Sequence, residues 1–271
     1  MPKERIDKLL VEKDLFPSRS KAKRAIMAGK IYVNQQLVDK AGSKVEVDSA
    51  IEVKGKVHPY VGRGGLKLAK AIKEFGLDFS DKTLLDIGAS TGGFTDCALQ
   101  NGASKAYAVD VGYNQLAWKL RSDDRVVVKE KTNARYLNQT DIKEKFSIIT
   151  IDVSFISLTK ILPALKDFLK SDTELITLIK PQFEAGPDKV GSGGVVKNPK
   201  IHKEVILKIL NFSQKLGFNL NGLTFSPITG GKKSNIEYLA CFSMQEKRIK
   251  DINKKVDSVI KQAHKKHYDK W

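Results

Sequence analysis

The sequence predicts a doubly wound α/β domain with a mostly parallel sheet, preceded by a small α+β domain. A length of 271 residues suits two domains, at about 150 residues per domain. From residue 83 onward, short apolar runs alternate with stretches of helical spacing, as in strand–helix–strand units. The start of the chain lacks that alternation. We therefore expect a small domain at 1–58, a linker at 59–64, the larger domain at 65–245 and a basic helix or tail at 246–271.

Two short helices are expected near the start of the chain. Apolar residues between Ile6 and Leu10 are spaced by three and four positions, so they share one helix face. Ser18 is a suitable N-cap for a second helix that ends at Gly29. Residues 17–30 contain five basic side chains and no acidic one. Since a solvated helix usually mixes both signs of charge, this stretch favours contact with phosphates.

This segment resembles the small RNA-binding domain named after ribosomal protein S4. The matching residues run from Arg5-x-Asp7 through Ser18-Arg19 to Val33-Asn34. The usual Asn-Gly turn of that family is Asn34-Gln35 here, and asparagine tolerates the left-handed conformation that such a turn needs. The resemblance implies a grip on structured RNA. The basic residues expected to contact the RNA are Arg5, Arg19, Lys21, Lys23, Arg24, Lys30 and, in the linker, Arg63.

Seven apolar runs predict the strands of the larger domain. They are residues 83–86, 106–110, 125–128, 147–152, 175–180, 223–226 and 236–242. Helical spacing marks residues 94–101, 158–170 and 201–216. Ligands of a doubly wound sheet bind at the carboxyl ends of its strands. We therefore look for functional side chains directly after these runs.

A glycine-rich loop follows the first of these strands, in the order Asp86-x-Gly88-x-x-x-Gly92-Gly93. Glycines there let a ligand approach the backbone and open a helix N-terminus. The spacing differs from the G-x-G-x-x-G of dinucleotide sites and is the arrangement expected for S-adenosylmethionine. Asp110 ends the next strand, where a carboxylate can accept hydrogen bonds from both ribose hydroxyls. An ordinary tight turn would not explain that second acid.

The cofactor-binding residues expected from this pattern surround the loop and the next two strand ends. They are Asp86, Gly88, Ala89, Ser90, Thr91, Gly92, Gly93, Phe94, Asp110, Val111 and Asn133. For Asn133, contact with the adenine edge of the cofactor and a role as a helix cap are equally compatible with its position.

Four charged residues lie where a sheet core does not need them. Asp152 and Lys180 end two apolar strands. Glu237 lies within or at the start of the last strand, and Lys67 lies on the helix that opens the larger domain. Each alone has an ordinary explanation at a strand end or on a solvated face. Together they form the Lys–Asp–Lys–Glu pattern of ribose 2′-O-methyltransferases, in which a lysine activates the 2′-hydroxyl. We expect Lys180 to be that lysine.

The whole chain is similar to the haemolysin-A-named, or TlyA, family of ribosomal RNA methyltransferases, whose catalytic half is FtsJ-like. Further motifs that carry this resemblance are Val61–Leu68, Thr132–Arg135, Asp152–Leu158, Lys180–Glu184, Gly193–Val196 and Ser226–Gly230. The resemblance implies a Rossmann-like fold and S-adenosyl-L-methionine as the cofactor. It also implies methylation of cytidine 2′-hydroxyls in ribosomal RNA or in ribosomal subunits.

Composition leaves two further hypotheses open. The chain has 48 Lys and Arg against 31 Asp and Glu, and a net charge of +17 predicts a polyanionic partner, nucleic acid before an anionic membrane. Cys97 and Cys241 lack metal-ligand spacing, so we expect no metal and a reducing cytoplasm. No apolar run approaches the roughly 18 residues of a spanning helix, so we expect no membrane partner. The alternatives are an RNA-binding protein with an inactive methyltransferase fold, and a membrane-active haemolysin that uses residues 246–271.

Overall fold

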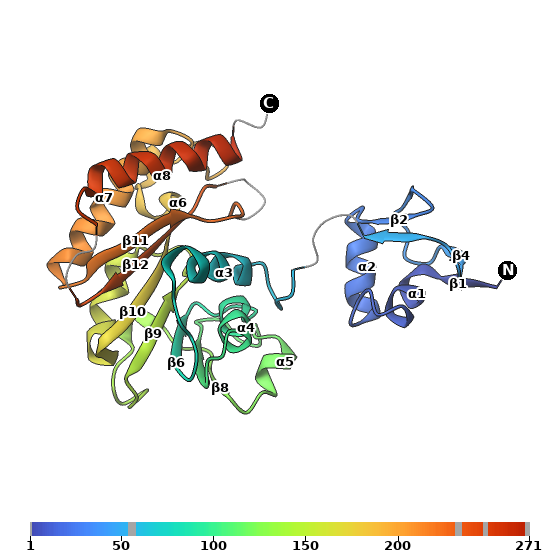
Figure 1. The fold of residues 1–271 in the computed structure, drawn as a ribbon, viewed down its shortest axis with the longest axis horizontal. Helices are drawn as coiled ribbons and strands as arrows, with labels where there is room; N and C mark the ends of the chain where they lie inside the picture. The colour runs from blue at the N-terminus through green and yellow to red at the C-terminus, as the bar shows by residue number, and fades with distance from the viewer. Residues whose placement is uncertain (1, 54–57, 231–234, 246–248, 269–271) are drawn as a thin grey trace. The chain divides into compact units, whose positions relative to one another are not determined.

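The computed structural model describes residues 2–53, 58–230, 235–245 and 249–268, and the chain divides into two compact units, Met1–Pro59 and Tyr60–Trp271. Figure 1 shows the fold of each unit. The start of the predicted linker therefore belongs to the first unit and the rest of it to the second. Of the residues assigned to the small domain and to the basic tail, residues 54–57, 246–248 and 269–271 lie outside the described part of the chain.

The first unit is a small α+β domain. Its elements are β1 (Lys3–Arg5), α1 (Ile6–Glu12), α2 (Arg19–Met27), β2 (Ile31–Val33), β3 (Gln36–Val38), β4 (Lys44–Glu46) and β5 (Ile51–Val53). The strands pair antiparallel as β3-β2-β5 and β1-β4. Ser18 caps α2, as predicted, by accepting a hydrogen bond from the backbone N–H of Lys21. Asn34 and Gln35 both have positive φ, 48° and 67°, so the turn between β2 and β3 keeps the left-handed form that the sequence predicts.

Three of the predicted RNA contacts of this unit also hold a buried carboxylate. The side chain of Asp7 is fully buried, and its oxygens lie 3.0 Å from Arg5 Nε, 3.0 Å from Arg19 Nη2 and 4.0 Å from Lys23 Nζ. The hydrogen bonds from Arg5 and Arg19 lower the pKa of Asp7 to about 2, with the larger effect from Arg5, although burial alone would raise it. The three cations are themselves about half exposed. They therefore stabilise the fold and still present charge to a partner.

The second unit is built on a seven-stranded sheet in the order β11-β12-β10-β9-β6-β7-β8. The strands are β6 (Thr83–Ile87), β7 (Lys105–Val109), β8 (Val126–Lys129), β9 (Phe146–Ile151), β10 (Leu169–Ile179), β11 (Asn219–Phe225) and β12 (Tyr238–Ser243). Five strands run parallel, from β8 to β10, and β12 runs antiparallel to both its neighbours. The predicted mostly parallel α/β sheet is therefore confirmed.

Helices cover both faces of this sheet, because alternate residues of the buried strands are apolar on each side. In β9, Ile149 and Ile151 join one apolar cluster and Ile148 joins the other. The helices are α3 (Gly64–Phe75), α4 (Gly93–Gln100), α5 (Trp118–Arg121), α6 (Pro181–Glu184), α7 (Pro199–Lys215) and α8 (Ile252–His267). Side chains of α3, α4 and α5 pack into the second cluster, and those of α7 and α8 into the first (Figure 1).

One predicted helix is wrong. Residues 158–170 form two short 3₁₀ helices, η2 (Leu158–Lys160) and η3 (Leu162–Phe168), and β10 begins directly afterwards. Pro163 lacks the N–H that a continuous α-helix would need from it, so the segment breaks at this point. The other 3₁₀ helices are η1 (Ala134–Tyr136) and η4 (Pro187–Lys189). Among the described residues, no helix has both the length and the apolarity needed to cross a bilayer.

The buried Asp7 predicts acid sensitivity of the first unit. Because its folded-state pKa of about 2 lies below the ordinary value of an aspartate, ionised Asp7 stabilises the fold at higher pH. That contribution is lost as the pH falls from about 4 to about 2. We expect Asp7→Asn to lower the hydrogen-exchange protection of α1 and α2 at pH 5 and to remove most of the further loss at pH 2.5. Asp14→Asn, an exposed control, should behave as the wild type; equal pH dependence in both variants would contradict the role of Asp7.

Candidate active site

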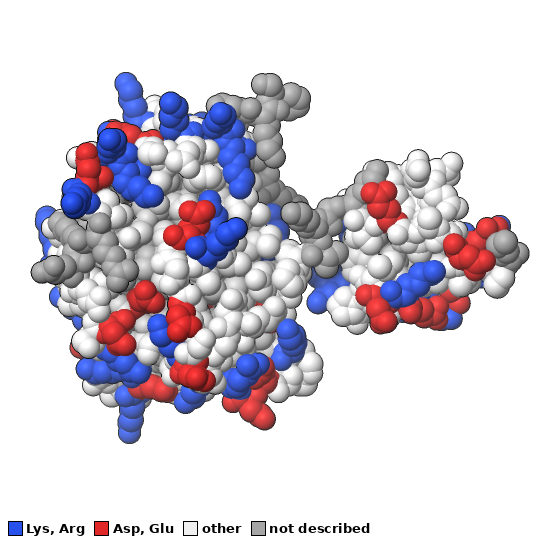
Figure 2. Space-filling model, in the orientation of Figure 1, with Lys and Arg blue, Asp and Glu red and all other residues white. Residues whose placement is uncertain are grey.

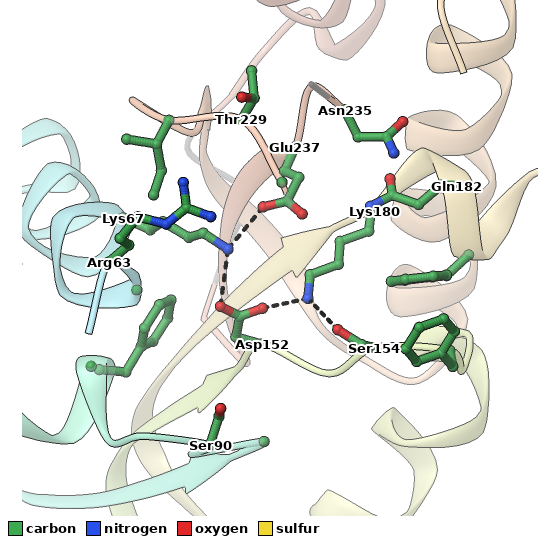
Figure 3. Close-up of a pocket in the computed structure, with 18 of the residues that line it drawn as sticks. Arg63, Lys67, Ser90, Asp152, Ser154, Lys180, Gln182, Thr229, Asn235 and Glu237 are labelled. Carbon is green, nitrogen blue, oxygen red and sulfur yellow. Dashed lines mark hydrogen bonds and ion pairs between the residues drawn. The ribbon is translucent and has the colours of Figure 1, made fainter. Parts of the chain in front are cut away.

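The candidate active site is a cavity at the carboxyl ends of β6, β9 and β10. Its volume is about 620 Å³. The glycine loop after β6 lines one side, the segments that follow β9 and β10 line another, and residues 228–230 and Asn235 line a third. Figure 3 shows the four predicted catalytic residues pointing toward one another in this cavity.

The four residues form a continuous ion-pair network. Asp152 lies between the two lysines, with Oδ2 3.1 Å from Lys67 Nζ and Oδ1 2.5 Å from Lys180 Nζ. Lys67 Nζ also lies 2.8 Å from Oε2 of Glu237. Lys180 Nζ donates a second hydrogen bond, of 3.0 Å, to the hydroxyl of Ser154. The structure thus brings together all four residues of the predicted tetrad (Figure 3).

Burial makes these charges depend on one another. The side chains of Lys67, Lys180 and Glu237 are each at most one-tenth exposed. Burial on its own would lower the pKa of Lys67, but Asp152 and Glu237 outweigh it and the pKa is raised. Burial would likewise raise the pKa of Asp152, yet the two ammonium groups hold it below its usual value. Lys67 and Asp152 are therefore both charged at neutral pH.

Sheet topology explains why these residues meet. Asp152 and Lys180 follow β9 and β10, which are parallel neighbours, so both side chains reach the same sheet edge. β12 runs antiparallel to β10, and Ile179 pairs with Tyr238, so the start of β12 lies beside the end of β10. Glu237 precedes β12 and thus lies next to the cavity instead of within the strand. Lys67 comes from α3, which packs against α4.

The glycine loop keeps these parts in close contact. Gly88 has a φ of +81°, and a Cβ there would fall 2.7 Å from the carbonyl oxygen of Asp152. A Cβ on Gly93 would fall 2.8 Å from the backbone nitrogen of Gly65, at the start of α3. Only glycine allows these approaches. The loop therefore sets the distance between the strand that carries Asp152 and the helix that carries Lys67.

Asp86 lies behind this loop and not at the cavity surface. Its side chain is fully buried and accepts hydrogen bonds from Thr95 N at 3.1 Å, Thr95 Oγ1 at 2.7 Å and Thr150 Oγ1 at 2.9 Å. Burial raises its pKa to about 6, although these hydrogen bonds oppose the shift. In the structure Asp86 fastens the first turn of α4 to β6 and β9. The sequence instead predicts direct contact with a ligand.

The other predicted cofactor residues divide into two groups. Most of the loop, from Gly88 to Thr91 with Gly93 and Phe94, lines the cavity. Asp110, Val111 and Asn133 lie outside the cavity lining. Asp110 accepts backbone hydrogen bonds of 2.7 Å from Ser90 and from Gly112, so it supports the loop. Asn133 caps η1 by accepting a hydrogen bond of 3.1 Å from Arg135 N, and Val111 is exposed.

Several side chains in and around the site were not predicted from the sequence, among them Ser154, Glu184 and Asn235. Ser154 binds Lys180 directly. Glu184 on α6 accepts hydrogen bonds from Ser157 Oγ at 2.6 Å and Leu158 N at 2.7 Å, so it joins the segments after β9 and β10. Asn235 holds the backbone of residues 194 and 196 beside the cavity. The only sequence signal for them was their position in stretches that follow or precede strand ends, which does not identify individual side chains.

The predicted RNA contacts stand in different places. Lys21, Arg24 and Lys30 are exposed in the first unit. Arg63 is exposed and lines the cavity of the second unit, beside the start of α3.

Comparison with known proteins extends this description. Residues 60–244 match the FtsJ-like methyltransferase family, and residues 4–51 match the S4 domain. A Bacillus subtilis protein, "Putative rRNA methyltransferase YqxC", is 56% identical over 88% of this chain and 84% of its own length. The 16S/23S rRNA (cytidine-2′-O)-methyltransferase TlyA of Mycobacterium tuberculosis is 40% identical over 90% and 91%. A solved structure, "Putative hemolysin from Streptococcus thermophilus", has 46% identity and a TM-score of 0.77, and covers 98% of this chain and 97% of that one.

The contact between Gly88 and Asp152 predicts a site-specific effect of one added methyl group. Gly88→Ala forces a Cβ against the Asp152 carbonyl and should displace the carboxylate. If this raises the activation free energy by about 1.4 kcal/mol or more, activity falls at least about 10-fold. Gly76→Ala is the matched control, because Gly76 has a similar φ of +66° and open space around it. It should cost about 1–2 kcal/mol of stability and leave activity unchanged. Methyl transfer and thermal unfolding measure the two effects; equal activity in both variants would contradict the prediction.

Proposed function

This chain belongs to the FtsJ-like methyltransferase family and carries an S4 domain, and from that premise we propose that it methylates the 2′-hydroxyl of a cytidine in ribosomal RNA. S-adenosyl-L-methionine is the methyl donor of this proposal. The observation that carries it is the buried Lys67–Asp152–Lys180 network, completed by Glu237, at the floor of the cavity. The name of the TlyA relative supports the choice of cytidine and of ribosomal RNA.

The cavity fits such a cofactor. Its volume of about 620 Å³ lies within the range of roughly 300–1,000 Å³ that ligand pockets show. The wall from Gly88 to Thr91 exposes backbone and short side chains, and Phe94 adds an apolar surface. These residues, with Gly93 at the start of α4, would hold the cofactor, and the helix N-terminus suits its carboxylate. The chemistry that the cofactor supplies when bound is an electrophilic methyl group on a sulfonium centre.

We propose that the Lys180 ammonium group contacts the 2′-oxygen of the substrate. An ammonium group has three donors, and Lys180 uses two of them, for Asp152 and Ser154. The third is available to a substrate oxygen in the cavity, where the charge of Lys180 would favour the alkoxide form of the 2′-hydroxyl while the hydroxyl proton leaves to solvent. Protonated Lys67 keeps Asp152 ionised, and Asp152 in turn holds Lys180 in place. Positioning of this kind supplies much of the rate enhancement in group transfer.

Two aromatic rings next to Lys180 suit the base of the target nucleotide. Phe155 is 90% exposed and lines the cavity. Its φ is +63°, a strained value for a residue with a large side chain. Its ring lies 4.9 Å from the ring of Phe183, which follows Lys180 by three residues. A strained and exposed phenylalanine beside a catalytic lysine is explained if the ring stacks on a base.

The S4 domain supplies the first contact with RNA in this proposal. Lys21, Arg24 and Lys30 give the S4 domain exposed positive charge, and Arg63 separately provides an exposed cation at the catalytic cavity of the second unit. With ribosomal RNA as its substrate, the protein acts in the cytoplasm in this proposal. An RNA-binding protein without activity would bind RNA but transfer no methyl group, and the experiments below distinguish it from an active methyltransferase.

Replacement of Lys180 is the direct test of the proposed reaction. We expect Lys180→Ala to lower methyl transfer from labelled S-adenosylmethionine to ribosomal RNA or subunits by a factor of about 100 or more, the usual effect of removing a donor that stabilises a developing oxyanion. Cofactor binding should persist. Lys143→Ala, a change of an exposed lysine at the opposite end of β9, is the control. Wild-type activity in Lys180→Ala would exclude the mechanism, and no transfer by the wild-type protein to any of these RNAs would exclude the function.

Replacement of Phe155 tests the stacking role. Stacking of one base on an aromatic ring contributes about 1–3 kcal/mol, so Phe155→Ala should lower kcat/KM for the RNA by a factor of roughly 5 to 150. The affinity for the cofactor should stay unchanged. Phe155→Trp should retain most of the activity, since it keeps a stacking surface. A fully active Phe155→Ala variant would rule out stacking.

A further inference from the structure

Helix α8 presents a basic surface that the proposed function does not use. Within Ile252–His267 there are five lysines and one acidic residue, Asp257. The five lysines are all exposed: Lys254, Lys255, Lys261, Lys265 and Lys266. Figure 2 shows basic side chains spread along the upper edge of the second unit, where Figure 1 draws α8. Such a concentration of one sign is unusual for a helix that is merely solvated.

The apolar side of α8 is already occupied. Val256, Val259, Ile260 and Ala263 are at most 5% exposed and belong to the apolar cluster that includes α7 and β11. A helix that binds a membrane inserts its apolar side into the lipid. In this fold α8 could do so only by leaving the core, which would expose that cluster. The basic side alone is therefore available to a partner.

Cations from two helices converge at the end of β11. Lys70 on α3 donates a hydrogen bond of 2.8 Å to the carbonyl oxygen of Phe225, and its Nζ lies 3.6 Å from the centroid of the Phe225 ring. Lys266 Nζ lies 5.5 Å from the same centroid, and the ring of His267 lies 5.8 Å from it. Burial lowers the pKa of Lys70. The negative charge of Glu74 opposes this decrease, and the positive charge of Lys266 adds to it. Like charges are thus held close together.

The lysines of this surface differ from others on the same unit. Lys119, Lys189 and Lys203 form ion pairs with acidic side chains. Within the described part of the chain, neither Lys70 nor any lysine of α8 has such a pair at 4.0 Å or less. Positive charge of this density without close ion pairs attracts a polyanion and is most readily explained by one.

The end of α8 that carries Lys265 and Lys266 also lies close to a segment that lines the catalytic cavity. His267 Nε2 lies 3.0 Å from the carbonyl oxygen of Ser226. The residues that follow Ser226 in the chain, Ile228, Thr229 and Gly230, line the cavity. A strand of RNA with one nucleotide in the cavity therefore has neighbouring phosphates within reach of this corner.

We propose that Lys70 and the outer face of α8 form a second RNA-binding surface, which contacts backbone phosphates next to the nucleotide in the cavity. This inference rests on the proposed function. It differs from the role of the S4 domain because it lies wholly on the catalytic unit. The contacts are to phosphates and so carry affinity and register without reading sequence.

The test compares two triple variants of the full-length protein. Lys70→Gln/Lys265→Gln/Lys266→Gln removes three charges from the proposed surface. Lys143→Gln/Lys145→Gln/Lys166→Gln removes three exposed lysines near the amino end of β9, at the opposite end of the parallel strands from the cavity. Binding to an RNA fragment that the wild type methylates is measured at several salt concentrations. At about 0.7 per phosphate contact, the slope of log K against log salt should decrease in magnitude by about 2 in the first variant and stay unchanged in the second.

Additional arms make each outcome decisive. Because Lys70 also binds the backbone of Phe225, Lys265→Gln/Lys266→Gln is tested too and should lower the slope by about 1.4; thermal unfolding checks that each variant is folded. Equal slopes for the surface and control variants, with an active wild type, overturn this inference alone. Loss of binding to phosphatidylglycerol vesicles without a change in the RNA slope overturns it in favour of a membrane. Absence of methylation and of RNA binding by the wild type overturns both proposals.

Discussion

The sharing of Asp152 between two ammonium groups is the interaction on which the catalytic unit depends. Lys67 and Lys180 come from α3 and from the end of β10, and Asp152 comes from the end of β9. Glu237, which directly precedes β12, joins the network through its ion pair with Lys67. Removing one member of a buried ion pair leaves an uncompensated charge, at a cost of about 3–5 kcal/mol. The same contacts therefore hold four segments together and position the Lys180 nitrogen to which we assign the reaction, so stability and the proposed chemistry are not separable here.

The surroundings of this network restrict its movement from several sides. Gly88 permits the loop after β6 to lie against Asp152, and Asp86 fixes the first turn of α4 from below. On the other side, His202 on α7 bonds both to Tyr238 Oη at 2.6 Å and to the carbonyl oxygen of Val196 at 2.8 Å. Burial lowers the pKa of His202 to about 4, so the ring is neutral and can serve as donor and acceptor at once. Glu237 thus precedes a residue that is anchored to α7.

The sequence was sufficient for features with a local or topological cause. Strand ends follow from apolar runs, and parallel neighbours place their carboxyl ends together, so Asp152 and Lys180 could be paired in advance. The sequence could not show whether a polar side chain faces a cavity or the layer beneath it. Asp86 and Asp110 end strands as predicted, yet both use their oxygens for hydrogen bonds that support the loop. Ser154 lies two residues beyond Asp152, and only the turn of the backbone brings it to Lys180.

The net positive charge of the chain is a second case in which the sequence does not show what each side chain contacts. A count of Lys and Arg weighs every cation alike, whereas the structure separates them by what they neutralise. Arg5 and Arg19 compensate the buried Asp7, and Lys67 compensates two carboxylates. The lysines on the outer face of α8 compensate no acidic side chain within the described residues and remain in water. Since a paired cation has already lost part of its attraction for phosphate, net charge alone overstates how much of the molecule faces RNA. In the proposed function, the distribution of the unpaired cations, rather than their total, determines where the RNA binds.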